Sequence, residues 1–548
     1  MFNRKKVISI SLVLIFMGLL ALSVYINWQS RQLFYLSDEK YDKLTSSYTR
    51  IKKPLCTDIL FENQPLFYDD STNTFYYSLI KSSETSYNPT IEAGDKVRLF
   101  AYGRPISDKL ISGNIPIKLI MVKDHEYSVS KLVCTTLPIM NISFSKATME
   151  ANELDDTFDI EEYIPCTIKL YDNRSDVEEE DRETTSYAKI HTRGGTTRNA
   201  LQKSYRLSLM EEKDDMDSER KEKLLGLRKD DDWILFAAYS DYEKIRTPFA
   251  MNLWHESSEG NNQWKASTAN EYQYIEMFFN NHYHGLYALC YPIDGKQLDL
   301  EDDKEALFKK RDWSRTEFSQ DLEYFEYEDG SGGYEYLPGY SLEDGEQDGY
   351  VKLHDLYYQM AYSNDNTDIR NTCDMDNAID LWLFYKLTQA VDNIYDSNVK
   401  NLYTAVKTTD EDDEYKVLFA PWDMDQTFGN RFVDGQGKNG ISSYFNTPDY
   451  DLPIAWSPVY FLMENDDAQI KKEIKDRYKE LRGKHWSDKA IAKSIDEYDA
   501  DIYGSGAYAR TKKRWPEANY LDKNGGLRTF KKYVLKRLSY MDEYIEKL

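Results

Sequence analysis

The hydrophobic pattern of the chain begins with one uninterrupted apolar run. The twenty residues Val7–Ile26 carry no charge and follow Arg4, Lys5 and Lys6. A helix of this length spans roughly 30 Å, the thickness of the hydrocarbon core of a bilayer. Because a basic flank stays in the cytoplasm, the run predicts a single-pass membrane anchor within residues 1–28, with the bulk of the chain extracytoplasmic. A cleaved signal peptide is the alternative, and it puts the remaining chain on the same side.

A different pattern follows over the next hundred positions. Residues 28–80 are polar and rich in tyrosine, which predicts a stalk. Short runs that alternate apolar and polar residues come next, and clusters of Asp, Gly and Pro separate them, which is typical of antiparallel strands. These runs are KVRLFAYG, PIKLIMVKD and EYSVSKLVCTT. We therefore expect residues 29–134 to form a stalk and a small β-sandwich-like module.

The remaining chain, 135–548, mixes strand and helix patterns. Strand-like runs fill its first half, and EYQYIEMFFNNHYHGLYALCYPID reads as a hairpin that turns at Asn280 and Asn281. Helical spacing marks AIDLWLFYKLTQAVD and most of the last hundred residues. Residues 299–372 are acidic and interrupted by glycine, so we interpret them as an insertion that could form a lid or a substrate platform. The pattern predicts an α+β protein.

Composition narrows the function classes. The chain has 69 Lys and Arg against 95 Asp and Glu, a formal charge of −26, and no long basic run. Nucleic-acid binding depends on cations that neutralise phosphates, so we expect no nucleic-acid partner. The five cysteines form no CxxC pair, which excludes a zinc ribbon. We interpret them as small buried residues, although one or two disulfides remain open.

A glycine-containing turn is the first candidate for chemistry. The stretch His191–Arg198 contains Gly194 and Gly195, and Lys203 follows a few residues later. Backbone N–H groups in such a turn can face an anion, and a nearby lysine adds positive charge. The turn does not fit the P-loop consensus, and an ordinary hairpin turn is the alternative.

Two further clusters contain carboxylates. In the first, Asp396 and Asn401 have the spacing of the acid and the metal ligand in a protein-kinase catalytic loop, and Asp392 competes for the role of the acid. In the second, Asp423 and Asp425 follow the apolar strand VLFA. Residues at i and i+2 of an extended strand share a face, so both acids could bind one cation. An Asx-rich turn and a capping aspartate are the alternative interpretations.

The order of these clusters agrees with that of the phosphoryl-transfer parts of protein kinases, although His-Arg-Asp and Asp-Phe-Gly strings are absent. The chain resembles the spore coat protein H (CotH-type) family of atypical kinases over roughly residues 137–548. The resemblance rests on seven segments in family order: LPIMNI, KIHTRGGTTRNALQKSYRLSL, WILFAAYSDYEKIRTPFAMNL, YIEMFFNNHYHGLYALCYPID, NAIDLWLFYKLTQAVDN, YDSNVKNLYTA and FAPWDMDQTFGN.

The resemblance implies a kinase-like domain with a β-rich N-lobe and a helical C-lobe, which uses ATP and Mg²⁺. It implies that Lys203 contacts the ATP phosphates, with Arg193, Gly194 and Gly195 forming the turn beside them. It also implies three roles near the metal. Asp396 or Asp392 is the catalytic acid, Asn401 is its metal-binding companion, and Asp423 holds Mg²⁺ with help from Asp425. Arg246 matches a family arginine that we interpret as structural.

The resemblance further implies transfer of the ATP γ-phosphoryl group to Ser or Thr hydroxyls of surface or spore-envelope proteins. The negative charge of the chain favours protein substrates with basic segments. Tyr291 and Pro292 stand where the family usually has Glu-Lys, so an inactive surface-binding or structural protein on a kinase-like scaffold is the main alternative. A glycan hydrolase with paired carboxylates is another, but no acid pair with suitable spacing is evident.

Overall fold

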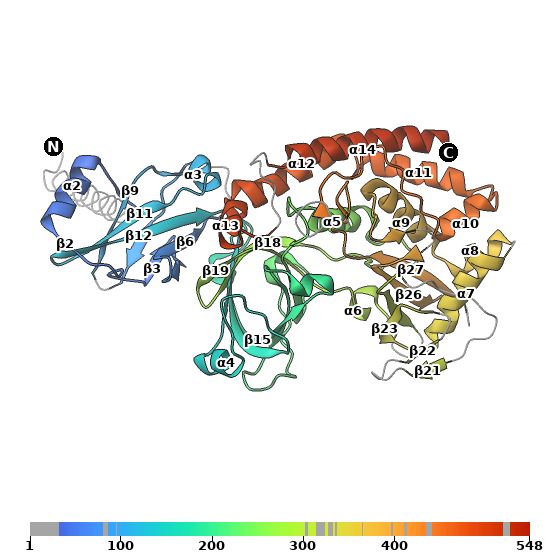
Figure 1. Ribbon diagram of the computed structural model, residues 1–548, viewed down its shortest axis with the longest axis horizontal. Helices are drawn as coiled ribbons and strands as arrows, with labels where there is room; N and C mark the ends of the chain where they lie inside the picture. Colours follow the sequence, from blue (N-terminus) through green and yellow to red (C-terminus); the bar gives the residue numbers. More distant parts are fainter. Residues whose placement is uncertain are drawn as a thin grey trace, which may run out of the picture.

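The computed structural model describes residues 32–80, 86–94, 96–301, 305–313, 324–326, 332–334, 337–363, 365–395, 398–409, 414–433, 441–518 and 526–548. The N-terminal strands lie at one end of the molecule, a barrel lies near the middle, and a sheet covered by helices lies at the other end (Figure 1). The anchor expected at Val7–Ile26 is outside the described residues. Within them, no helix has both the length and the apolar character needed to cross a membrane.

The N-terminal region is built on a seven-stranded sheet in the order β1-β9-β11-β12-β6-β5, with β2 beside β12. The bounds are β1 (Tyr35–Leu36), β2 (Thr49–Arg50), β5 (Phe67–Asp69), β6 (Thr74–Ser78), β9 (Arg98–Tyr102), β11 (Ile117–Lys123) and β12 (Glu126–Thr135). The three alternating runs form β9, β11 and β12 and pair antiparallel, as predicted.

The segment expected to be a stalk is folded into this region. Strand β6 pairs in parallel with β12, and Phe75 on β6 is fully buried. A second, three-stranded sheet and a two-stranded sheet accompany the first. Their strands are β3 (Ile59–Phe61), β4 (Gln64–Pro65) and β8 (Ile91–Ala93), then β7 (Ser86–Tyr87) and β10 (Ile106–Ser107). The tyrosines of this segment contribute to packing, with Tyr77 at 1% exposure inside the cluster.

Seven strands then close into a barrel in the order β13-β14-β15-β16-β17-β19-β18. They are β13 (Ile139–Ser143), β14 (Ile164–Tyr171), β15 (Glu183–Arg193), β16 (Ser204–Met210), β17 (Asp232–Phe236), β18 (Gln273–Phe279) and β19 (His282–Cys290). The hairpin predicted at Asn280 and Asn281 joins β18 and β19, and both turn residues have positive φ. The parallel pair β13–β18 closes the barrel around a buried apolar interior.

A four-stranded sheet in the order β23-β20-β26-β27 lies beyond the barrel. Its strands are β20 (Ala306–Lys310), β23 (Tyr340–Gly345), β26 (Leu402–Thr408) and β27 (Tyr415–Pro421). Strands β20 and β23, together with helix α7 (Gly349–Tyr362), come from residues 299–372. The described part of this predicted insertion is therefore continuous with the sheet: β20 pairs with β26 along its whole length. Strand β20 shows no alternation of apolar and polar residues because nearly all of it is buried, whereas β23 has exposed positions.

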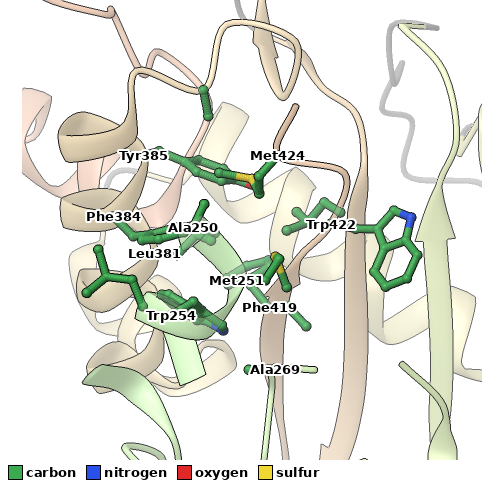
Figure 2. Packing of buried hydrophobic residues seen from close by; sticks show 14 of the residues in the cluster. Ala250, Met251, Trp254, Ala269, Leu381, Phe384, Tyr385, Phe419, Trp422 and Met424 are labelled. Carbon is green, nitrogen blue, oxygen red and sulfur yellow. The ribbon is translucent and has the colours of Figure 1, made fainter. Parts of the chain in front are cut away.

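Helices cover this sheet and extend toward the N-terminal region. They are α5 (Arg246–Ser258), α8 (Asn366–Thr372), α9 (Met375–Thr388), α10 (Pro458–Glu464), α11 (Ile470–Gly483), α12 (Asp488–Asp499), α13 (Ala507–Arg514) and α14 (Arg528–Lys547). One hydrophobic cluster joins them to the sheet. Close up, Trp254 of α5 packs near Leu381 and Phe384 of α9 (Figure 2). All five cysteines are buried and free, which confirms the interpretation of them as small core residues.

Candidate functional site

The candidate site lies where two loops meet at one end of the four-stranded sheet. The first loop runs from the end of α9 to the start of β26 and carries Asp392 and Asn401, while the second follows β27 and carries Asp423 and Asp425. Buried Asn393 connects them, because its Nδ2 donates to the carbonyl oxygens of Asn401 at 3.2 Å and Trp422 at 2.8 Å. The amide of Trp422 also donates to the carbonyl of Asn401, at 3.0 Å. Asp396 lies outside the described residues.

Asp392 is held by two partners on its own loop. Its carboxylate accepts from the Nζ of Lys400 at 3.1 Å and from the Nδ2 of Asn401 at 3.0 Å. Burial raises the pKa of Asp392, the charge of Asp423 raises it further, and Lys400 opposes the shift. Because the amide nitrogen of Asn401 is bound to Asp392, its amide oxygen is the atom suited to a metal ion. Asn401 has a φ of 54°, so the backbone turns sharply there.

Asp423 and Asp425 approach each other through a bent backbone. Both follow the end of β27, and Asp423 has a φ of 55°, so the shared face of an extended strand does not apply here. Trp422 and Met424 accordingly point to different sides, Met424 toward Tyr385 and Trp422 away from it, and both side chains are buried (Figure 2). Burial raises the pKa of Asp425 well above its usual range, and the charges of Asp423 and Asp392 raise it further. The three carboxylates are therefore close enough to repel one another.

A third segment, between β17 and α5, packs against the second loop. The Oγ of Ser240 donates a hydrogen bond to Asp425. Asp241 accepts from the backbone N–H groups of Ile245 and Arg246, both at 2.7 Å, and so caps α5. Arg246 is fully buried, and its Nε donates to the carbonyl of Thr427 at 3.0 Å. Arg246 thus joins the two segments, in agreement with its interpretation as structural.

The predicted glycine turn joins β15 and β16 on the barrel. Gly194 has a φ of +122°, and a Cβ added there would lie 2.5 Å from the Oγ1 of Thr197, so only glycine fits. Arg193 pairs with Ser204 across the hairpin, and its guanidinium lies over the ring of Trp422, 5.7 Å from the centroid. Arg193 therefore reaches the second loop.

Lys203 points to the other side of the same hairpin. Side chains alternate along a strand, so Lys203 shares a face with Tyr205, which lies in the barrel interior. Its Nζ is 3.0 Å from the carboxylate of Asp159 and donates to the carbonyl of Arg198 at 2.9 Å. The structure thus brings Asp392, Asn401, Asp423, Asp425 and Arg193 toward one place, while the described contacts of Lys203 lie on the barrel.

The chemistry of this donor set fits Mg²⁺. Carboxylate and amide oxygens are hard ligands of the kind that Mg²⁺ prefers. Among the described residues, the group whose ligand atoms all lie within 4.8 Å of one another is Asp69, Asp70 and His282, so the three carboxylates of this site are spaced more widely. Burying several carboxylates together lowers the stability of the fold unless they bind protons or a cation. The raised pKa of Asp425 has the same cause. A divalent cation bound among them would supply the missing charge.

Sequence reasoning missed two contributors, Ser240 and Lys309. Ser240 follows the buried run WILFAA, where a polar residue at a strand end is a usable signal. Lys309 lies on β20 with its Nζ 5.4 Å from the ring centroid of Trp422. No local signal identifies Lys309, because only the pairing of β20 with β26 brings it to the site.

Comparisons with known proteins agree with the earlier resemblance. The family described as CotH kinase protein matches residues 190–541, more than half of the chain. The matched region begins in β15 and ends in α14, so it contains all the site residues described above. A comparison with curated proteins gives no match.

Proposed function

Because the chain belongs to the CotH kinase protein family, we propose that it transfers the γ-phosphoryl group of ATP to Ser or Thr hydroxyls with the help of Mg²⁺. The observation that carries the proposal is that Asp392 and Asp423 lie near Asp425. Their charges raise the pKa of Asp425. Phosphoryl transfer requires positioning and neutralisation of charge more than covalent chemistry, and an acidic cluster that takes up a cation suits this need.

Each residue has a role that follows from its position. Asp423 and Asp425 would hold Mg²⁺ with the amide oxygen of Asn401, and such an ion would neutralise charge on the phosphates. Ser240 fixes one oxygen of Asp425. Asp392 accepts the proton of the attacking hydroxyl, because its raised pKa makes it a better base than an exposed aspartate. Before the proton is transferred, Lys400 stabilises the ionised carboxylate of Asp392.

Asp396 remains the second candidate for the acid. It precedes Asn401 with the spacing of the protein-kinase catalytic loop, whereas Asp392 has described contacts with Asn401 and a raised pKa. Replacing each by asparagine separates them. If Asp392 is the base, Asp392→Asn lowers the maximal rate of transfer and Asp396→Asn does not.

The setting of the reaction is also part of the proposal. Val7–Ile26 would anchor the chain in the membrane, with the site outside the cytoplasm. Substrates would be surface or spore-envelope proteins with Ser and Thr in basic segments, because the net charge of −26 attracts cations.

One observation favours an inactive scaffold as the second candidate. Tyr291, which replaces the glutamate usual in the family, is buried, and the guanidinium of Arg228 lies 4.4 Å from its ring centroid. Tyr291 therefore contributes to packing at this position. An inactive protein would bind its surface ligand equally well after Asp423→Asn.

The position of the transferred label tests the reaction class. Full-length protein is incubated with Mg²⁺ and a basic Ser-rich peptide, with ATP labelled at either the γ or the α phosphate. Label from the γ position alone, recovered as phosphoserine, supports the kinase. Label from the α position would indicate nucleotidyl transfer, and no label from either would favour the scaffold.

A further inference from the structure

Two cations from separate elements lie against the same indole ring. The Nζ of Lys309, on β20, is 5.4 Å from the ring centroid of Trp422, and the guanidinium carbon of Arg193, at the end of β15, is 5.7 Å from it. Trp422 directly precedes Asp423, and its buried side chain points away from Met424 and Tyr385 (Figure 2). The two cations therefore contact the residue that is next to Asp423 in the chain.

These cations differ from their neighbours in having no carboxylate partner among the residues that the structure describes. Nearby lysines are paired: Lys400 with Asp392, Lys310 with Asp312, Lys407 with Glu305 and Lys203 with Asp159. Among the residues described by the structure, no ion pair involves Arg193 or Lys309. Both side chains are half-buried. In a chain of net charge −26, two partly buried cations that contact the same ring and have no ion pair within the described residues are suited to bind an anion.

We infer that Arg193 and Lys309 form the phosphate-binding pair of the site. Through Lys309, the described part of residues 299–372 contributes to this site. The inference rests on the proposed function. The pair binds phosphate oxygens of a nucleoside triphosphate that face away from Mg²⁺, while the acidic cluster holds the ion. Arginine donates in a planar fork and lysine as a point charge, so two phosphate groups can be held at once.

The alternation of side chains explains why Lys203 is not part of this pair. Arg193 pairs with Ser204, so the neighbouring Lys203 points to the opposite face of the hairpin and toward Asp159. A phosphate bound by Lys203 would have to replace that ion pair. Within the described part of the chain, Lys309 and Arg193 have no such pair to lose.

Nucleotide affinity tests the inference. Binding of ATP and AMP to full-length protein with Mg²⁺ is measured by calorimetry for Arg193→Gln and Lys309→Gln. Each is expected to weaken ATP binding by about 10-fold or more and AMP binding less, because AMP lacks the outer phosphates. Lys352→Gln is the matched control, since Lys352 also lies over a ring, that of Tyr415 at 5.0 Å, at the far end of β27. Lys352→Gln should leave both affinities unchanged.

The outcomes separate this inference from the proposed function. ATP affinity unchanged in both variants would overturn the inference. Lys203→Gln, measured in the same way, is expected to keep its affinity, and a loss confined to this variant would also overturn the inference. If wild-type protein binds ATP through the pair but transfers no phosphoryl group, the proposed function fails and the inference stands. If wild-type protein binds no ATP, both fail. Lys309→Arg keeps the charge and should retain affinity, which excludes a folding defect as the cause.

Discussion

At the scale of single residues, Asp425 is a candidate metal ligand whose burial lowers the stability of the metal-free protein. Its carboxylate is buried beside two other acids, and its pKa is raised well above the usual value. The folded protein therefore binds a proton at this group at pH values where the unfolded chain does not. Stability without metal consequently falls as the pH rises above the unfolded pKa of Asp425.

Replacing Asp425 with asparagine should remove this loss of stability. We expect Asp425→Asn to raise the thermal midpoint of the metal-free protein at pH 7 and to weaken its fall as the pH rises above the pKa of an unfolded aspartate, while abolishing Mg²⁺ binding. Asparagine can still accept the hydrogen bond of Ser240. Calorimetric melts with EDTA and with Mg²⁺ check both effects. A variant less stable than wild type in EDTA would contradict this account.

Asn401 separates a backbone role from a ligand role. Its φ of 54° favours asparagine or glycine. Asn401→Gly and Asn401→Ala should both lose the hydrogen bond to Asp392 and reduce Mg²⁺ affinity. Asn401→Ala should be less stable than Asn401→Gly by about 1–2 kcal/mol, because only alanine is strained at this φ. Urea unfolding and Mg²⁺ titration measure the two effects. Equal stability losses in both variants would contradict the backbone role.

At the scale of elements, one buried ion pair fixes strand β20 against β26. The Nζ of Lys407 lies 2.8 Å from Glu305, and both side chains are only 3% exposed. Glu305 also accepts from the backbone of Thr408 at 2.8 Å. Lys407→Met should cost about 3–5 kcal/mol, because it leaves a buried carboxylate without its cation.

The displaced strand would carry Lys309 with it, so the same change should also weaken ATP binding. Adding Glu305→Gln to Lys407→Met should recover part of the stability, since the uncompensated charge is then removed. Urea unfolding of the single and double variants checks this. A double variant as unstable as the sum of its parts would contradict the pairing.

The elements also show what the sequence could predict. Hairpins of long alternating strands, such as β18–β19 and β26–β27, were predictable because pattern and turn are local. The sequence predicts a stalk where β5 and β6 lie, because these strands are short and β6 pairs with β12, which is distant in the sequence. At the site, spacing pointed to Asp423 and Asp425, while Ser240 and Lys309 arrive through contacts distant in sequence.

At the scale of the whole molecule, α13 links the three parts. Arg510 is ion-paired with Glu276 of the barrel, and both side chains are nearly fully buried. Its Nη1 donates to Asn114 of the N-terminal region at 3.0 Å. Near this junction, Phe67 and Tyr76 of the N-terminal region pack with Phe278 of β18. The N-terminal region is therefore expected to unfold together with the barrel.

Removing this link should destabilise the molecule as a unit. Arg510→Met leaves Glu276 buried without a cation, so we expect a loss of about 3–5 kcal/mol with a single unfolding transition. Arg514→Met, on the same helix beside the more exposed Asp156, is the control and should cost less than about 1 kcal/mol. Two separate transitions in wild-type protein would contradict the joint unfolding.

The central claim is that the acidic cluster makes this protein a Mg²⁺-dependent kinase. The most direct test measures transfer of label from γ-labelled ATP by wild type, Asp423→Asn and Asp355→Asn, with and without Mg²⁺. Asp355 accepts from Tyr415 at the other end of the sheet and serves as the matched control. The account predicts transfer that requires Mg²⁺, survives Asp355→Asn and falls by about 100-fold or more in Asp423→Asn. Equal transfer by wild type and Asp423→Asn, or none by either, would contradict it.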